Sequence, residues 1–95
     1  MKQIIKEFEV FMSKYGRLHS QFYIGIASNP KDRLINGHRV SSGIPYIYWG
    51  NPLNTNIVRA IEKHFLDKGC KGGPGGGDNS TNYIYAYLIT SQTRQ

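Results

Sequence analysis

The sequence predicts an α+β fold in which a small, mainly antiparallel three-stranded sheet is flanked by helices. Apolar residues recur at three- and four-residue steps in two segments, and short aromatic and β-branched runs lie between turn residues in three others. The length of 95 residues fits one small domain around a single core. We therefore expect one domain over residues 1–95 that begins with a helix at about residues 2–15.

Two longer segments have the periodicity of amphipathic helices. Over residues 2–15, apolar side chains recur on one side while lysines and glutamates occupy the other, and Gly16 ends the segment. Another helix is expected to begin after a cap at Asn54 or Thr55 and to continue to about Lys68. Both helices should pack their apolar sides against the core.

A shorter helix is expected between these two. Asn29 can cap its first turn, Pro30 suits the first helical position, and Gly37 ends it. This helix carries Arg33, whose planar guanidinium can hold a phosphate through two hydrogen bonds and stays charged. The alternative for Arg33 is a solvated arginine on the helix surface.

Three strands are expected at residues 20–27, 44–49 and 83–89, where aromatic and β-branched residues lie between polar or turn-forming boundaries. Before the last strand, residues 69–77 hold six of the chain's eleven glycines. This composition predicts either a flexible connector or a loop that lies against a nucleic-acid backbone. The polar tail, residues 90–95, is expected to fray.

The composition favours a polyanionic partner. The chain has 12 Lys and Arg against 6 Asp and Glu, a net charge of +6, which favours contact with nucleic acid such as DNA. Cys70 is the only cysteine, so the chain forms no internal disulfide and no cysteine-based zinc site, as expected in a reducing compartment. With no apolar run long enough for a membrane span and no secretory signal, we expect a soluble cytoplasmic protein without a membrane partner.

Glu62 does not fit the pattern of the helix that carries it. At about 100° per residue, it falls inside the arc of the apolar side chains of that helix. Burying an unpaired carboxylate costs several kcal/mol, so a carboxylate there needs a metal ion, an arginine or dense hydrogen bonding. Glu62 is therefore expected either to bind a metal ion or to lie at the rim, paired with Lys63, Arg59 or Arg33.

Tyrosines gather on two of the expected strands. Residues of one face recur at every second position of a strand, so each of these strands should present a stripe of tyrosines. The two stripes are Tyr46 with Tyr48, and Tyr83 with Tyr85 and Tyr87. Most such tyrosines belong to a core, but single-stranded nucleic acid can stack on a stripe that is exposed beside basic residues.

Four features occur in an order that resembles the GIY-YIG nuclease family, in particular its short, stand-alone prokaryotic and phage members. They are the segment Tyr23-Ile24-Gly25, Arg33 ten positions after Tyr23, His38 just beyond it, and Glu62 in a later amphipathic helix. The resemblance implies a small sheet flanked by helices and the hydrolysis of phosphodiester bonds in DNA. It also implies one divalent cation, Mg²⁺ or Mn²⁺, bound by the helical glutamate.

By this resemblance, Tyr23 would lie beside the reacting phosphate, Arg33 would hold that phosphate, and Glu62 would ligate the cation. His38 is expected either to shuttle a proton or contact a phosphate, or to be a loop histidine without such a task. The expected catalytic residues are Tyr23, Arg33, His38 and Tyr48, and the expected nucleic-acid contacts are Gly25, Lys31, Arg39 and Lys71.

One motif of the family has no recognisable counterpart here. The family carries a Gly-Ile-Tyr motif on a strand shortly before Tyr-Ile-Gly, whereas this chain reads Ser13-Lys14-Tyr15-Gly16-Arg17-Leu18 there. The tyrosine of that motif often serves as general base, so this role would fall to Tyr46, Tyr48 or His38. The alternative function is a catalytically inactive nucleic-acid-binding or protein-binding module, for example a phage or mobile-element inhibitor.

Overall fold

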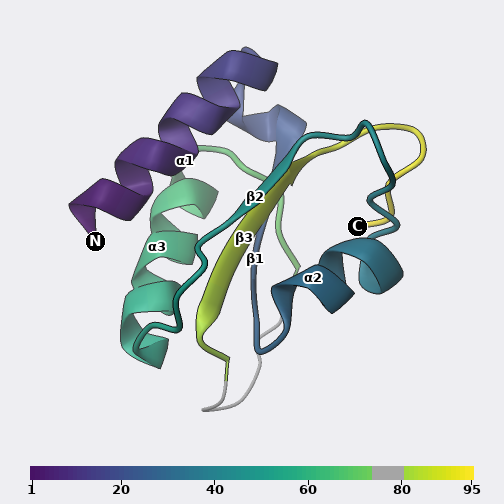
Figure 1. Ribbon diagram of the computed structural model, residues 1–95. Coiled ribbons are helices and arrows are strands. Elements are labelled where there is room, and N and C mark those ends of the chain that lie inside the picture. The colour runs from purple at the N-terminus through teal and green to yellow at the C-terminus, as the bar shows by residue number, and fades with distance from the viewer. Residues whose placement is uncertain (74–80) are drawn as a thin grey trace.

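Residues 1–73 and 81–95 are described by the structure, a computed structural model (Figure 1). The fold is the expected α+β arrangement of a small antiparallel sheet and helices. In chain order, its elements are α1 (Lys2–Tyr15), a 3₁₀ turn (His19–Gln21), β1 (Phe22–Ala27), α2 (Pro30–Asp32) with a π-helical turn (Arg33–Gly37), β2 (Tyr46–Tyr48), α3 (Thr55–Asp67) and β3 (Tyr83–Leu88). Part of the glycine-rich loop, residues 74–80, lies outside the described residues.

The three strands form an antiparallel sheet in the order β1-β3-β2. In the register, Gly25 of β1 lies opposite Tyr85 of β3, and Tyr48 of β2 lies opposite the same tyrosine from the other side. The ladder between β1 and β3 continues past the strands, because the Ile89 N–H donates to the Gln21 carbonyl at 2.9 Å. The strand that is latest in the chain is therefore the central strand of the sheet.

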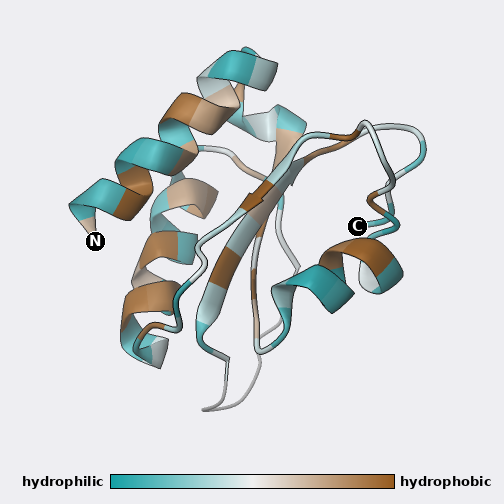
Figure 2. Ribbon diagram, in the orientation of Figure 1, coloured by the Kyte–Doolittle hydropathy of each residue, from teal (hydrophilic) through white to brown (hydrophobic). Residues whose placement is uncertain are grey.

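The main apolar core fills the space between one face of the sheet and two helices. Figure 1 shows α1 and α3 on the same side of the sheet, and Figure 2 shows apolar segments of both helices beside apolar segments of the strands. The fully buried side chains of this core include Phe8, Phe22, Ile24, Ile61, Phe65 and Ile84. The expected amphipathic helices are thus confirmed, but three of the side chains expected on their apolar sides are exposed: Tyr15 by 43%, and Ile57 and Leu66 by 38% each.

The opposite face of the sheet is covered by α2 and the segment that follows it (Figure 1). Leu34, Val40 and Ile44 pack there against the rings of Tyr85 and Tyr87. Because side chains alternate along a strand, the odd-numbered residues of β1 and β3 and the even-numbered residues of β2 share this face in the observed register. Most of the expected site residues therefore lie on the α2 side.

The asparagine caps act as expected. The Asn54 side chain accepts the Asn56 N–H at 2.7 Å, and the Asn29 side chain accepts the Asp32 N–H at 3.1 Å. The π-helical turn was not expected, and in it the His38 N–H reaches back to the Arg33 carbonyl at 2.9 Å. This wider turn extends the helix to His38 and directs the His38 side chain towards the face of the sheet.

The expectation that the tail frays is wrong. Thr90 and Thr93 close a turn in which the Thr90 N–H donates to the Thr93 hydroxyl at 2.9 Å. The Arg94 N–H then donates to the His38 carbonyl at 2.7 Å. The tail is polar, but its backbone hydrogen bonds fix it beside the α2 face.

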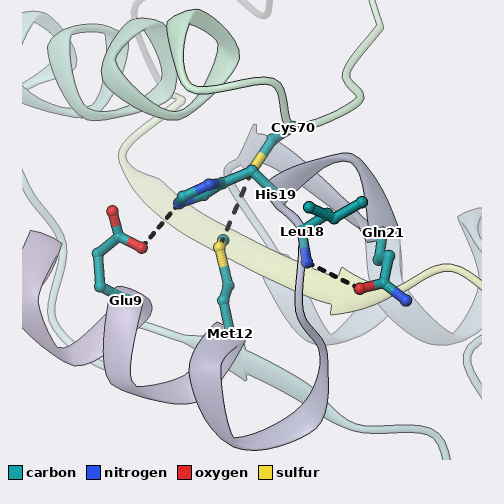
Figure 3. Close-up of polar contacts among 6 residues, drawn as sticks. All are labelled: Glu9, Met12, Leu18, His19, Gln21 and Cys70. Carbon is teal, nitrogen blue, oxygen red and sulfur yellow. Dashed lines mark hydrogen bonds and ion pairs between the residues drawn. The ribbon is translucent and has the colours of Figure 1, made fainter.

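Polar and sulfur contacts join α1 to the segment before β1 and to the segment after α3 (Figure 3). The His19 Nε2 lies 2.8 Å from the Glu9 Oε1, and the Cys70 Sγ lies 3.9 Å from the Met12 Sδ. Cys70 is buried, and burial raises the pKa of its thiol to about 12. The thiol therefore stays protonated near neutral pH. Because the thiolate is the reactive form of cysteine, Cys70 is unreactive at this pH.

Among the described residues, no helix is both long and apolar enough to cross a membrane.

Candidate nucleic-acid and catalytic site

A hydrogen-bonded group of rings lies on the α2 face of the sheet. Tyr23 of β1 is half-buried there, and its ring centroid lies 4.6 Å from that of His38 and 5.2 Å from that of Tyr87. The Tyr23 hydroxyl oxygen accepts the Gly73 N–H at 2.9 Å. The phenol oxygen is thereby held in place while its own proton can still be donated to a ligand.

His38 is buried, with 5% of its surface exposed, and both ring nitrogens have partners. The Nδ1 lies 2.8 Å from the Arg94 carbonyl oxygen, and the Nε2 lies 2.6 Å from the Tyr85 hydroxyl. A carbonyl oxygen only accepts, so Nδ1 carries the hydrogen and Nε2 accepts the proton of Tyr85. The tail carbonyl of Arg94 thus selects the tautomer of His38.

Tyr87 completes this cluster from the next position of β3 on the same face. Its hydroxyl donates to the Arg94 carbonyl at 3.3 Å and lies 3.1 Å from the His38 Nδ1. Tyr87 is fully buried, and burial raises the pKa of its phenol. It is therefore a neutral phenol that supports the contact between His38 and the tail.

Tyr85 is the residue at which the expected site residues meet. Its side chain is 1% exposed, and burial raises the pKa of its phenol; the nearby Tyr23 and Glu62 raise this pKa further. The Arg33 guanidinium opposes these effects through its charge and a hydrogen bond to the Tyr85 side chain. Tyr23, Arg33 and His38 therefore contact the side chain of Tyr85, whereas Glu62 acts on this phenol through its charge.

The electrostatics keep His38 neutral. Burial lowers the pKa of its imidazole, the hydrogen bond to Arg94 raises it, and the positive charge of Arg33 lowers it. The net shift is downward from the usual value of 6.5. A neutral imidazole with a fixed tautomer is a proton acceptor at Nε2.

Gly25 is needed for this arrangement because of its place opposite Tyr85. A Cβ built on Gly25 would overlap the Cζ and Oη atoms of Tyr85. The sequence suggested that Gly25 allows a phosphate to approach the backbone, whereas the group that approaches it in the structure is the tyrosine ring. Any larger side chain here would displace the phenol from His38.

Arg33 is exposed in the π-helical turn after α2. The side chain runs close to Gly37, where an added Cβ would lie 3.3 Å from the Arg33 Cδ. Because Arg33 is exposed and also hydrogen-bonded to Tyr85, its permanent positive charge lies between solvent and the buried rings. A guanidinium in this position can bind the anionic oxygens of a ligand that approaches from solvent.

Glu62 of α3 is half-buried, and the expected alternatives, a metal ligand or a rim carboxylate paired with a basic side chain, both stay open. Burial raises the pKa of its carboxyl, and the charge of Arg59 lowers it. No group of three or more His, Cys, Asp or Glu residues that could hold a metal ion occurs within residues 1–73 and 81–95. A single carboxylate nevertheless suits Mg²⁺, which keeps several waters and takes substrate phosphate oxygens as further ligands.

The remaining expected site residues lie around this cluster rather than within it. Tyr48 is on β2, on the far side of Tyr85 from β1, and its ring stacks with that of Tyr46. Lys31 and Arg39 are exposed at the two ends of the α2 segment, and Arg39 has a left-handed φ of 57°. The expected contact at Lys71 is also exposed, and its backbone pairs with the edge of β1.

No protein-family model matches the chain, and no curated protein or solved structure matches it either. The function must therefore be inferred from the site itself. That site combines tyrosines, a buried neutral histidine, an exposed arginine and one half-buried carboxylate on a chain of net charge +6. Groups of this kind can bind anions and transfer protons.

Proposed function

We propose that this protein is a metal-dependent endonuclease of the GIY-YIG type that hydrolyses phosphodiester bonds in DNA. The observation that carries the proposal is that Tyr23, Arg33 and His38 meet at the side chain of Tyr85, on which the charge of Glu62 also acts. The sequence suggested Tyr23, Arg33, His38 and Glu62 from their order alone. The contacts of the first three with Tyr85 support a shared chemical role.

The position of β3 supports the proposal in a second way. The resemblance requires a tyrosine-bearing strand next to β1, and no such strand precedes β1 in this chain. β3 pairs antiparallel with β1, and its end lies beside the start of β1, where the Ile89 N–H donates to the Gln21 carbonyl at 2.9 Å. We infer that β3 takes the place of the missing strand and that Tyr85 takes the place of its tyrosine.

Binding of the scissile phosphate falls to Arg33 and Tyr23. The Arg33 guanidinium pairs with the anionic oxygens and stabilises the charge that develops during attack. The Tyr23 hydroxyl, whose oxygen already accepts the Gly73 N–H, donates its proton to a phosphate oxygen. Arg33 is exposed and Tyr23 half-buried, so both groups can reach an ester that approaches from solvent.

Tyr85 and His38 supply the route for the proton of the attacking water. A water proton passes to the Tyr85 Oη while the Tyr85 proton passes to the His38 Nε2, and the water oxygen bonds to phosphorus. The bond from phosphorus to the leaving sugar oxygen breaks, and that oxygen takes a proton from solvent. The resulting imidazolium keeps its Nδ1–H on the Arg94 carbonyl, 2.8 Å away.

Glu62 is the residue that would hold a divalent cation. Its carboxylate is half-buried and its charge raises the pKa of Tyr85, and a hard cation such as Mg²⁺ or Mn²⁺ prefers oxygen ligands of this type. When bound, such a cation supplies Lewis-acid stabilisation of charge on the phosphoryl group. The single carboxylate leaves coordination positions for water and substrate.

A plasmid-nicking assay tests the proposal. Supercoiled DNA is incubated with Mg²⁺ or Mn²⁺ and the protein, or with its Arg33→Ala, Glu62→Gln or Tyr85→Phe variant. We expect nicking by the unaltered protein and a loss of at least about 100-fold in each variant, since each removes one group of the reacting set. Lys63→Ala, an exposed neighbour on α3, is the control and should retain activity. Unchanged nicking in both Arg33→Ala and Glu62→Gln would contradict the mechanism.

The near-complete burial of Tyr85 favours a second candidate function. With only 1% of this residue exposed, water has little direct access to its side chain, as expected of a module that binds without cleaving. Such a module would shift DNA in gels in a salt-sensitive way, or co-purify with a host protein, with no nicking under either metal. For either function we propose a cytoplasmic location, which suits the buried free thiol of Cys70.

A further inference from the structure

A second aromatic feature of the α2 face is a parallel pair of rings on the edge strand β2. The rings of Tyr46 and Tyr48 lie within 1° of parallel, with centroids 6.5 Å apart. Tyr46 is 48% exposed, whereas Tyr48 is half-buried and packs against the tyrosine cluster. The pair thus has one ring open to solvent and one ring anchored to the sheet.

The surface beside this pair is hollowed and carries a positive charge. A hollow of about 420 Å³ is lined by Lys31, Tyr48 and Tyr83, and an adjacent one of about 160 Å³ is lined by Lys31, Ile35 and Tyr46. Lys31 lies at the boundary of both hollows and is exposed. Tyr48 and Tyr46 therefore line two hollows that share Lys31.

We propose that Tyr46, Tyr48 and Lys31 form a binding site for single-stranded nucleic acid. Unpaired bases stack on the exposed face of this tyrosine pair, and Lys31 contacts the phosphate between them. Every base has a flat π-face, so stacking suits a strand of any sequence, whereas bases in a duplex are already stacked on one another. The net charge of +6 complements the backbone of such a strand.

The position of this stacking site relates it to the candidate catalytic cluster. Tyr48 is the register partner of Tyr85, and Tyr46 is the register partner of Tyr87. Neighbouring strands lie about 4.8 Å apart, so the stacking site is within one or two nucleotides of the Tyr85 phenol. This placement rests on the proposed nuclease function and specifies its substrate as DNA with an unpaired segment, whereas the stacking itself does not depend on cleavage.

Fluorescence of a single-stranded oligonucleotide that contains 2-aminopurine tests the proposal directly, because stacking on an aromatic ring quenches this base. We expect quenching by the unaltered protein, and affinity that is about 5- to 100-fold weaker in Tyr46→Ala. Tyr46→Phe keeps the ring and should bind as the unaltered protein does. Leu18→Ala changes an exposed apolar side chain on another part of the surface and should also leave binding unchanged.

Lys31→Ala separates the phosphate contact from stacking. This variant should retain quenching at saturation, and the slope of log affinity against log salt should fall by about one unit. The protein should also bind the oligonucleotide more tightly than the corresponding duplex. Equal affinity in Tyr46→Ala and the unaltered protein, or a preference for duplex, would overturn the stacking proposal.

The same proteins in the nicking assay distinguish this proposal from the proposed function. Nicking without a binding defect in Tyr46→Ala would overturn the stacking site and leave the nuclease intact. Quenching that Tyr46→Ala abolishes, with no nicking under Mg²⁺ or Mn²⁺, would support the stacking site and overturn the nuclease. Because Tyr46 is exposed, Tyr46→Ala should not change the stability of the fold, so a loss of binding reports on the stacking site.

Discussion

The two faces of the sheet are both buried, but they are built from different chemistry. On the α1 and α3 face, the packing is mainly between apolar side chains, as where the rings of Phe8 and Phe65 lie 6.0 Å apart. On the α2 face, buried rings are joined by hydrogen bonds between His38 and its tyrosine partners. The first face supplies most of the hydrophobic stabilisation, and the second holds titratable groups in fixed geometry.

This difference means that substitutions on the two faces should fail in different ways. Loss of apolar volume leaves a cavity and lowers the free energy of unfolding. A shift of one of the hydrogen-bonded rings leaves a buried donor or acceptor without its partner. The geometry of the site should then be lost before the fold is. The following four changes test this distinction, beginning with the largest expected effect.

Phe65→Ala should have the largest effect on stability. Phe65 is fully buried in the core between α3 and the sheet, so its truncation should lower the free energy of unfolding by about 3–5 kcal/mol. Denaturant unfolding followed by circular dichroism measures this change. The neighbouring Leu66→Ala, at a side chain that is 38% exposed, should cost about 1 kcal/mol or less. Equal losses in the two variants would contradict the assignment of the core.

Gly25→Ala should damage the α2 face with a smaller loss of stability. The new methyl group would overlap Tyr85 and push its phenol away from His38, at a cost of about 1–3 kcal/mol. DNA nicking and chemical unfolding should be measured together, and nicking should be lost while the protein is still folded. Gly50→Ala is the control, because an added Cβ there meets no atom within 4 Å. Full activity in Gly25→Ala would show that the Tyr85 position is not critical.

Arg39→Gly should stabilise the fold while it weakens nucleic-acid binding. Arg39 has a φ of 57°, a left-handed conformation that costs a non-glycine residue about 1–2 kcal/mol. Glycine adopts this conformation without strain, so the melting temperature should rise by a few degrees. Affinity for DNA, measured by fluorescence anisotropy, should fall because one exposed positive charge is removed. A rise in both quantities would argue against a DNA contact at Arg39.

Acidification should destabilise the α2 face gradually and give the smallest effect. The folded-state pKa of His38 is lowered from 6.5, so the unfolded chain binds the proton more readily. The stability from neutral His38 is fully present above pH 6.5 and is lost as the pH falls towards the lower folded-state pKa. The melting temperature of the protein should therefore fall below this pH more steeply than that of His38→Asn. Parallel curves for the two proteins would exclude this contribution.

The local elements were predictable because their signals are local. Periodicity and caps locate α1 and α3 to within a residue or two, and the run before Ala27 identifies β1. The order β1-β3-β2 was not predictable, since it depends on pairing between segments far apart in the chain. Register and strand order therefore needed the structure.

The candidate site was predicted in part for the same reason. Tyr23, Arg33, His38 and Glu62 belong to a sequence pattern, whereas Tyr85 joins them only through the sheet. The alternation of tyrosines along β3 was a signal that they share a face, but it did not show which strand would lie beside them. The tail contacts His38 through backbone atoms of Arg94. Every residue type has these backbone atoms, so the sequence could not indicate this contact.

The central position of β3 also has a consequence for how the protein folds during synthesis. β1 and β2 leave the ribosome before β3, yet neither has a neighbouring strand until β3 is made and inserts between them. The sheet must therefore form after β3 has been translated. Its strands pair through contacts of large sequence separation, and such contacts are typical of proteins that fold slowly. Until then the edges of β1 and β2 that pair with β3 are open, so conditions that delay synthesis of β3 should favour aggregation of the nascent chain.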